Sequence, residues 1–215
     1  MGGIGAAIIL ERPDRGTMTR PQHTRRTALG FRVKSGWTVA VLVAGPAADP
    51  VVLDRRIVTL SDPAVAGSSQ PYHAGTGLAE TDPGRFGSMV QAVERYAGNA
   101  LWALFAGYRA DGHALAGVGI VVGTDGDPER IANQHIQAHA REGRLFRRVL
   151  EEAARAERLP CAILVERDAY RTAAAALGGD EDGLRQRVAG MRPPAGGPWR
   201  AVDKLAALAA WAALA

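Results

Sequence analysis

Two short stretches of the sequence are apolar almost without interruption: ALAGVGIVVG at 114–123 and PCAILVE at 160–166. Such runs are typical of parallel β-strands that are buried on both faces of a sheet. A long helical pattern, from Asp127-Pro128 to about Glu157, separates them and supplies the crossover that two parallel strands require. The second half of the chain is therefore predicted to contain a strand–helix–strand unit, which restricts the fold to the α/β class.

The region before these strands has the pattern of an antiparallel meander. Three strands are predicted, at 28–34, 37–44 and 50–60. Ser35-Gly36 is a typical hairpin turn between the first two strands. Arg55 and Arg56 indicate that the third strand lies at an exposed edge of the sheet. Two further helices are predicted, from Pro83 to near Gly112 and over 199–215.

The predicted order is strand, strand, strand, helix, strand, helix, strand, helix. This order resembles the ribonuclease H-like fold, which is shared by ribonucleases H, Holliday-junction resolvases, integrases and, in duplicated form, actin-like ATPases. The resemblance covers residues 28–215. It implies a mixed five-stranded sheet, an antiparallel three-strand meander plus two parallel strands, flanked by helices. It also implies a hydrolase or nuclease-like phosphoesterase that acts on nucleic acid or another phosphate ester.

The positive charge of the chain is concentrated at its N-terminus. Most of the net charge of +4 comes from residues 1–28, which contain five arginines and only two acidic residues, Glu11 and Asp14. The remainder is nearly neutral, so bulk charge does not by itself indicate a surface that follows phosphates. Residues 1–27 lack a periodic pattern and are predicted to be a disordered tail, with translation starting at Met1 or Met18. Residues 28–215 are predicted to form a single domain.

The cellular compartment is predicted from two features of the sequence. The single cysteine, Cys161, excludes an internal disulfide and is typical of a reducing compartment. No signal peptide and no membrane-spanning stretch is recognisable, so we expect a cytoplasmic protein with no membrane partner. The oligomeric state cannot be inferred.

The tripeptide Lys34-Ser35-Gly36 stands at the end of the first predicted strand. In the families that the chain resembles, this strand commonly ends in Asp-x-Gly, and the aspartate binds a divalent metal ion. Two-metal catalysis requires several carboxylates in one place, and a cation among them removes a ligand and adds repulsion. We therefore expect an altered site in place of the standard two-metal site, with dependence on a divalent metal left open.

Further acidic residues lie where the resemblance implies site residues. Glu166 ends the fifth predicted strand, and Asp203 lies in the first turns of the last predicted helix. A structural ion pair with Glu166 or Asp203 explains Lys34 as well as a catalytic role does. Asp203 near a helix N-terminus is favourable without any functional role.

The helix after the fourth predicted strand carries polar side chains on its inward face. At 100° per residue, His135, His139 and Glu142 fall in the same sector as the apolar residues of the later turns. The His-x-x-x-His spacing is also that of metal ligands. Three interpretations stay open: hydrogen-bonded structural histidines, a polar site without metal, and a metal site. His73 either joins them from its loop or is an ordinary loop histidine.

Two functional hypotheses follow. In the first, the protein is an enzyme in which Lys34 binds phosphate and His135 or His139 is the general acid/base. Glu166 or Asp203 would then orient these groups or act as a ligand. In the second, the protein is a non-catalytic member of the fold that binds nucleic acid or a protein partner. Convergence of these side chains on one cleft would favour the enzyme.

Overall fold

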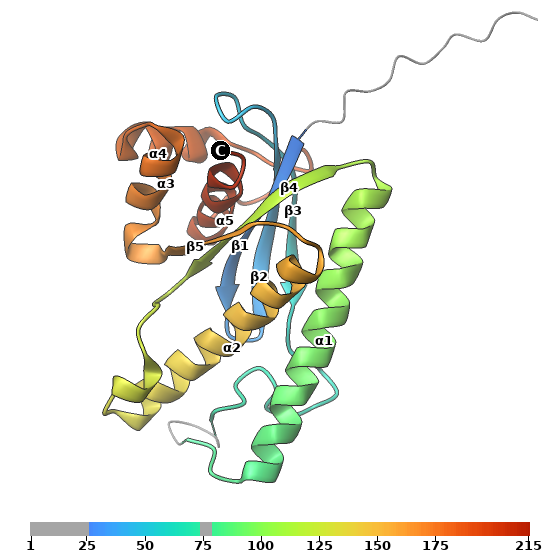
Figure 1. Cartoon of the computed structure of the whole chain (residues 1–215), viewed down its shortest axis with the longest axis vertical. Helices are drawn as coiled ribbons and strands as arrows, with labels where there is room; N and C mark the ends of the chain where they lie inside the picture. The colour runs from blue at the N-terminus through green and yellow to red at the C-terminus, as the bar shows by residue number, and fades with distance from the viewer. Residues whose placement is uncertain (1–25, 74–78) are drawn as a thin grey trace, which may run out of the picture.

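A computed structural model describes residues 26–73 and 79–215 of the protein. The predicted tail and Met18 lie outside these residues, except that Arg26 and Thr27 already belong to the first strand. Figure 1 shows a sheet with helices on both faces. Within the described ranges, no helix combines the length and the hydrophobicity that crossing a membrane would require.

The sheet of the described residues contains five strands in the order β3-β2-β1-β4-β5. They are β1 (Arg26–Lys34), β2 (Trp37–Ala44), β3 (Val51–Thr59), β4 (Ala114–Val122) and β5 (Cys161–Val165). β2 is antiparallel to both of its neighbours, whereas β4 is parallel to both β1 and β5. The predicted combination of a meander with two parallel strands is therefore confirmed, and β3 lies at an edge as expected.

Helices cover the two faces of the sheet in different ways (Figure 1). Two long helices, α1 (Pro83–Ala110) and α2 (Gln134–Ala156), pack on one face. The other face is covered by α5 (Ala201–Ala212), with α3 (Ala169–Leu177) and α4 (Glu181–Gly190) packed beside it. Because side chains alternate along a strand, β1 contributes Phe31 and Val33 to the first core and Ala28 to the second.

The alanine-rich helix α5 lies unusually close to the sheet. Gly30 of β1 and Gly119 of β4 face it, and neither glycine has room for a side chain. An ideal Cβ on Gly119 would lie 2.2 Å from the carbonyl oxygen of Ala209. Small residues on both elements thus allow the two backbones to approach each other.

Two helices begin later than predicted, one by six residues and the other by two. Asp127-Pro128 opens only a short 3-10 turn, η1 (Pro128–Arg130), and α2 begins at Gln134. The cap and proline signals are the same for both kinds of helix, but Ile131 is extended and interrupts the helical path. The last helix likewise begins at Ala201 rather than at 199.

Candidate functional site

Three histidines and a glutamate from two separate segments meet at one end of the sheet. His73 lies in the loop between β3 and α1, whereas His135, His139 and Glu142 lie in the N-terminal half of α2. The ring centroid of His73 lies 5.2 Å from that of His135 and 4.4 Å from that of His139. The rings of His135 and His139 are 4.5 Å apart. We call these four residues the histidine cluster.

The geometry of α2 brings three members of the cluster together. His135, His139 and Glu142 stand at positions i, i+4 and i+7, which share one face of a helix. Asn133 fixes where the helix begins, because its side chain accepts a hydrogen bond of 3.1 Å from the backbone N–H of Ile136. Glu142 is buried, whereas both histidines of α2 are exposed at the rim.

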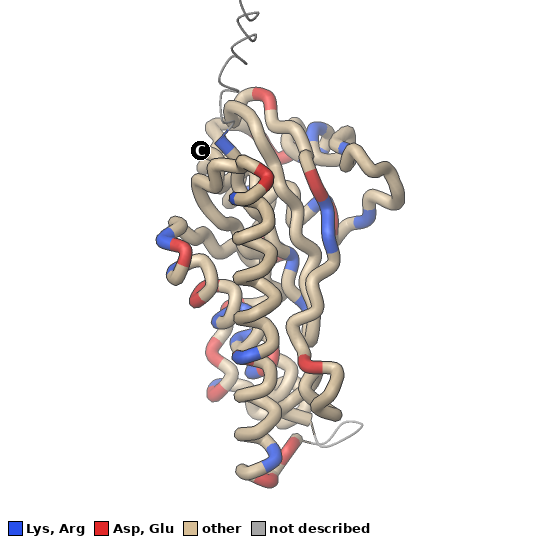
Figure 2. Tube along the Cα trace, turned by 90° about the vertical axis from the view of Figure 1, so that its right-hand side faces the viewer, with Lys and Arg blue, Asp and Glu red and all other residues tan. Residues whose placement is uncertain are grey.

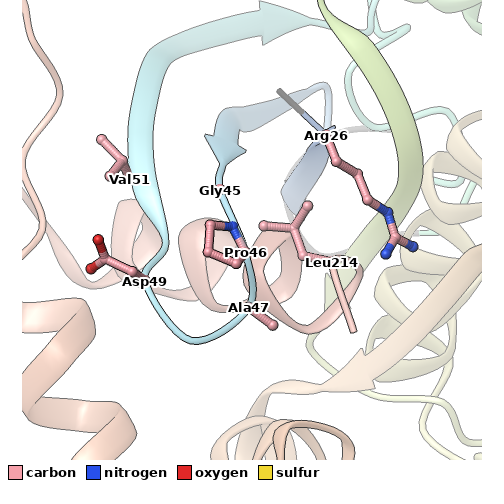
Figure 3. A pocket seen from close by; sticks show the side chains of 7 residues that line it. All are labelled: Arg26, Gly45, Pro46, Ala47, Asp49, Val51 and Leu214. Carbon is pink, nitrogen blue, oxygen red and sulfur yellow. The ribbon is translucent and has the colours of Figure 1, made fainter. Parts of the chain in front are cut away.

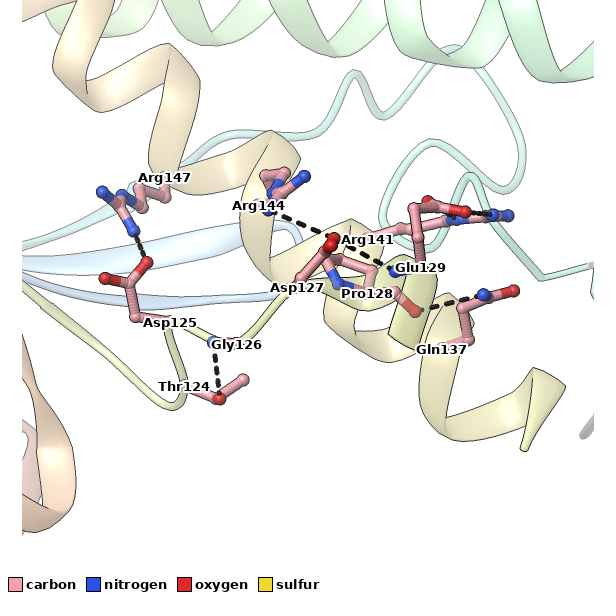
Figure 4. A network of polar contacts seen from close by, with 10 residues as sticks. All are labelled: Thr124, Asp125, Gly126, Asp127, Pro128, Glu129, Gln137, Arg141, Arg144 and Arg147. Atoms are coloured by element: carbon pink, nitrogen blue, oxygen red, sulfur yellow. Dashed lines mark hydrogen bonds and ion pairs between the residues drawn. The ribbon is translucent and has the colours of Figure 1, made fainter. Parts of the chain in front are cut away.

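The loop that precedes α2 is tied to the helix by a polar network, shown in Figure 4. Three acidic residues of the loop each pair with an arginine of α2: Asp125 with Arg147, Asp127 with Arg144, and Glu129 with Arg141. These ion pairs hold the loop against α2 and so fix the direction in which the helix leaves the sheet.

The loop that carries His73 is fixed from both sides. The backbone N–H of His73 donates to the carbonyl of Gln70 at 3.0 Å, and that of Glu80 donates to the carbonyl of Tyr72 at 2.9 Å. The Tyr72 ring packs on Phe86 of α1, with the ring centroids 4.8 Å apart. Burial raises the pKa of Tyr72, so its phenol stays neutral. His73 itself is only 9% exposed.

Glu142 connects the histidines to the first hairpin. Its side chain is fully buried, and a buried carboxylate is stable only with partners. Nδ1 of His73 lies 2.6 Å from one carboxylate oxygen of Glu142, and Nδ1 of His139 lies 3.5 Å from the other. The Ser35 hydroxyl is also 3.5 Å from that second oxygen. One glutamate thus faces two imidazoles and the turn between β1 and β2.

The contacts with Glu142 use only Nδ1 of His73 and Nδ1 of His139, and each ring has a second nitrogen. In the neutral ring, with Nδ1–H of His73 donating to Glu142, the lone pair is on Nε2. This Nε2 is buried and has no hydrogen-bond partner among the residues that the structure describes. Nε2 of His139 lies 3.2 Å from Nε2 of His135. One ring nitrogen from each histidine lies within 4.8 Å of the other two, so these three residues could hold a metal ion.

The hairpin at the end of β1 adjoins the cluster. Gly36 has φ of +78°, which glycine adopts without strain and which closes the tight turn. Ser35 faces Glu142, as described above. Lys34 is half-buried, and it lies two residues after Arg32 on the same face of β1, the face that α5 covers. The lysine is therefore close to the cluster along the chain, but its side chain leaves β1 on the other face of the sheet.

The two predicted carboxylates lie in separate ion pairs. Glu166 pairs with the buried guanidinium of Arg32. Asp203 is fully buried, and its Oδ1 lies 2.8 Å from Nε of Arg55 on β3. Its Oδ2 accepts a hydrogen bond of 2.7 Å from the backbone N–H of Arg200, which caps α5. The ion pairs considered for Lys34 are thus made by arginines.

The six residues predicted for the site therefore divide into groups. His135, His139 and Glu142 meet in the cluster, Lys34 lies at the neighbouring hairpin, and Glu166 and Asp203 are engaged elsewhere. His73 completes the cluster. It lies in a loop, where no periodic pattern indicates the direction of a side chain, and its only signal in the sequence is its residue type.

A hollow lies at the end of β1 that is opposite to the histidine cluster (Figure 3). It has a volume of about 640 Å³ and is lined by Arg26, Gly45, Pro46, Ala47, Asp49, Val51 and Leu214. In Figure 3 the guanidinium of Arg26 points away from the other lining residues. None of the predicted site residues lines this hollow, and the chemically versatile side chains gather at the histidine end.

No protein-family model matches the chain, and no curated protein matches it. The chain is similar to the solved structure of T. thermophilus RuvC in complex with Holliday junction substrate, with a TM-score of 0.51 and 11% identity over 87% of this chain and 91% of that one. Another Thermus thermophilus RuvC structure has a TM-score of 0.43 and 13% identity over 86% and 92% of the two chains. The first similarity, together with the mixed sheet, shows that this protein has the ribonuclease H-like fold.

Proposed function

We propose that this protein acts on nucleic acid, or on another phosphate ester, as a hydrolase or nuclease-like phosphoesterase with the histidine cluster as its site. The observation that carries the proposal is the position of the cluster. Ser35, the first residue after β1, contacts Glu142, and α2 leaves the carboxyl end of β4. In open α/β sheets, ligands bind outside the carboxyl ends of the strands. A Holliday junction bound to RuvC, a protein of the same fold, makes nucleic acid the first substrate to test.

The cluster has the groups that proton transfer to and from a phosphate ester requires. His135 and His139 are exposed, so their rings are accessible to a ligand. Imidazole is the side chain that most often acts as general acid or base near neutral pH. Glu142 orients His73 and His139, and thereby takes the orienting role that the sequence assigned to Glu166 or Asp203. Lys34 leaves β1 on the opposite face of the sheet, so the phosphate-binding role predicted for it is not part of this proposal.

A hollow on another side of α2 offers a second place for a phosphate-bearing ligand. It has a volume of about 240 Å³ and is lined by three arginines of α2, Arg141, Arg144 and Arg148, together with Tyr72, the residue before His73. At 100° per residue, these arginines lie on a different side of α2 from His135 and His139. Arg141 is held by Glu129 at 2.8 Å, but the carboxylate oxygen of Asp127 lies 3.7 Å from Arg144, beyond hydrogen-bond distance. Arg148 pairs with Glu94, so the guanidinium of Arg144 is the one best placed to turn toward an anion.

The distribution of charge favours a local contact over a broad basic surface. Figure 2 shows Lys and Arg interspersed with Asp and Glu along the chain, without a large region of one sign. A protein that neutralises few phosphates has a shallow dependence of affinity on salt. We expect the ligand to be recognised mainly at the cluster and the arginine-lined hollow.

The alternative, a non-catalytic member of the fold that binds nucleic acid or a protein partner, is supported by one observation. Glu166 and Asp203, which the fold would use as metal ligands, are each neutralised by an arginine. Under this alternative the protein binds a ligand through the same end of the sheet but releases no product.

We expect His139→Ala to lower the rate of phosphodiester hydrolysis about 100-fold or more, because it removes one exposed imidazole and one partner of Glu142. The rate would be measured with bis(p-nitrophenyl) phosphate and with labelled four-way, duplex and single-stranded DNA. His113→Ala is the matched control, since His113 packs against Tyr108 far from the cluster. Equal rates for both variants would exclude the cluster as the site. Binding of DNA without any product would establish the non-catalytic alternative.

Arg144→Ala is expected to weaken binding of the same DNA about 10-fold or more, because a hydrogen bond between an ion and its partner contributes roughly 1.5–3 kcal/mol. Fluorescence anisotropy at fixed salt would give the dissociation constants. Arg155→Ala, on the exposed surface of the same helix near its C-terminus, is the control. If both substitutions weaken binding equally, the arginine-lined hollow has no special part in recognition.

A further inference from the structure

We propose that His73, His135 and His139 together bind one divalent transition-metal ion of the zinc class. The site would use one ring nitrogen from each histidine, with Glu142 as the outer carboxylate that orients two of the rings. This inference does not depend on the proposed function, because binding of a metal ion can be measured without any substrate. When the ion is bound, His135 and His139 are its ligands and do not act as general acid or base.

The first argument concerns the nitrogens that hydrogen bonds leave unsatisfied. A hydrogen bond between His135 and His139 would account for their Nε2–Nε2 distance of 3.2 Å. It would leave the buried Nε2 of His73 without a partner among the described residues, which is costly for a buried polar atom. A metal ion shared by all three rings satisfies every one of these nitrogens at once.

The second argument is the spacing of the ring nitrogens. In tetrahedral zinc sites the Zn–N distance is about 2.0–2.1 Å, which separates two ligand nitrogens by about 3.3–3.4 Å. The observed 3.2 Å between the Nε2 atoms of His135 and His139 is close to this separation. The third ligand nitrogen would come from His73, and one ring nitrogen from each of the three histidines lies within 4.8 Å of the other two. A small movement of the rings would bring the set around one ion.

The third argument is the outer carboxylate. Histidines that bind a metal ion almost always donate their other N–H to a carboxylate, a carbonyl or water, which fixes the tautomer and the ring orientation. Nδ1 of His73 and Nδ1 of His139 both face Glu142, at 2.6 Å and 3.5 Å from its two oxygens. The arrangement leaves Nε2 of each ring as the ligand atom. The negative charge of Glu142 also partly offsets the charge of the ion.

The ligand set selects the class of ion. Three imidazoles suit Zn²⁺, Co²⁺, Ni²⁺ or Cu²⁺, whereas Mg²⁺ and Ca²⁺ require oxygen ligands. Three protein ligands leave a fourth tetrahedral position open, as in catalytic zinc sites. His135 and His139 are exposed, so this position would be reached from solvent. The site differs from a carboxylate two-metal site both in its ligands and in the number of ions.

The test uses the full chain after removal of metal ions with a chelator. Isothermal titration with Zn²⁺ is expected to show one ion bound per chain, Co²⁺ should give the visible spectrum of a tetrahedral nitrogen site, and Mg²⁺ should not bind. His73→Ala, His135→Ala and His139→Ala should each weaken Zn²⁺ binding by more than the roughly 10–100-fold that loss of an outer carboxylate costs. Glu142→Gln should weaken Zn²⁺ binding by an amount within that range, and His113→Ala should leave Zn²⁺ binding unchanged.

Folding of each variant would be checked by circular dichroism. His135 is exposed on a helix surface, so His135→Ala keeps the test decisive even if the buried His73→Ala variant does not fold. Absence of Zn²⁺ binding by the unmodified protein, or undiminished binding by His135→Ala, would overturn the proposal. Zn²⁺ binding without phosphodiester hydrolysis would refute the proposed function and retain the metal site. Hydrolysis that is insensitive to the chelator, by a protein that binds no Zn²⁺, would refute the metal site and retain the proposed function.

Discussion

Replacing Gly30 with alanine is expected to lower the free energy of unfolding by about 3 kcal/mol or more, at the upper end of what overpacking a core costs. An ideal Cβ at this position would lie 1.8 Å from the carbonyl oxygen of Ala206 and 2.5 Å from the backbone nitrogen of Ala210. Both are backbone atoms of α5, which cannot rotate away as a flexible side chain can. The helix must therefore move off the sheet and lose the contacts of a close-packed interior.

A matched substitution on α1 gives the control for Gly30→Ala. Gly98 lies on the exposed surface of that helix, and a Cβ there would meet no atom within 4 Å. Gly98→Ala should raise the free energy of unfolding by about 1 kcal/mol, because alanine is favoured over glycine inside a helix. Urea denaturation of the two variants would measure both changes. If Gly30→Ala is as stable as the unmodified protein, α5 does not approach β1 as closely as the structure shows.

The sheet could be predicted from sequence because its strands carry strong local signals. The uninterrupted apolar runs at 114–123 and 160–166 became β4 and β5, and the Ser35-Gly36 turn sets the register of the first hairpin. Local signals do not report distant contacts. The close approach of α5 to Gly30 depends on two segments far apart in the chain, so nothing near Gly30 indicates it.

The start of α2 shows a second limit of local signals. Asp127 caps a helical turn and Pro128 opens it, as their residue types predict, but the turn ends at Arg130. Cap signals specify where helical geometry begins and not how far it continues, because continuation depends on packing. The polar network of the 124–130 loop with α2 is the part that the sequence pattern could not supply (Figure 4).

The candidate site was predictable only where helical periodicity applied. The shared face of His135, His139 and Glu142 follows from their spacing, and the structure brings these side chains together. His73 reaches them from a loop, 69 positions before Glu142 in the chain. The partners of Glu166 and Asp203 lie 134 and 148 positions away, so the sequence alone could not separate structural ion pairs from site ligands.

Asp203→Ala should lower the free energy of unfolding by about 3–5 kcal/mol, the loss typical of removing one partner from a buried ion pair. Asp203 is fully buried, and Arg55, its partner across the interface between α5 and β3, is largely buried too. The substitution also leaves the backbone N–H of Arg200 without its acceptor and uncaps α5. Asp168→Ala is the control, since the partners of Asp168, Arg167 and Arg171, are exposed, and such pairs contribute only about 0–1 kcal/mol.

The same substitution separates the structural role of Asp203 from the site role that the resemblance implied. If the ion pair with Arg55 explains Asp203, a double-mutant cycle of Asp203→Ala with Arg55→Ala should give a coupling energy of at least about 1 kcal/mol. The folded fraction of Asp203→Ala should then bind Zn²⁺ as tightly as the unmodified protein, because the histidine cluster packs on the opposite face of the sheet. If Asp203→Ala instead keeps its stability but loses ligand binding, Asp203 is a residue of the functional site. The carboxylates that the resemblance implied would then form part of one site in this protein.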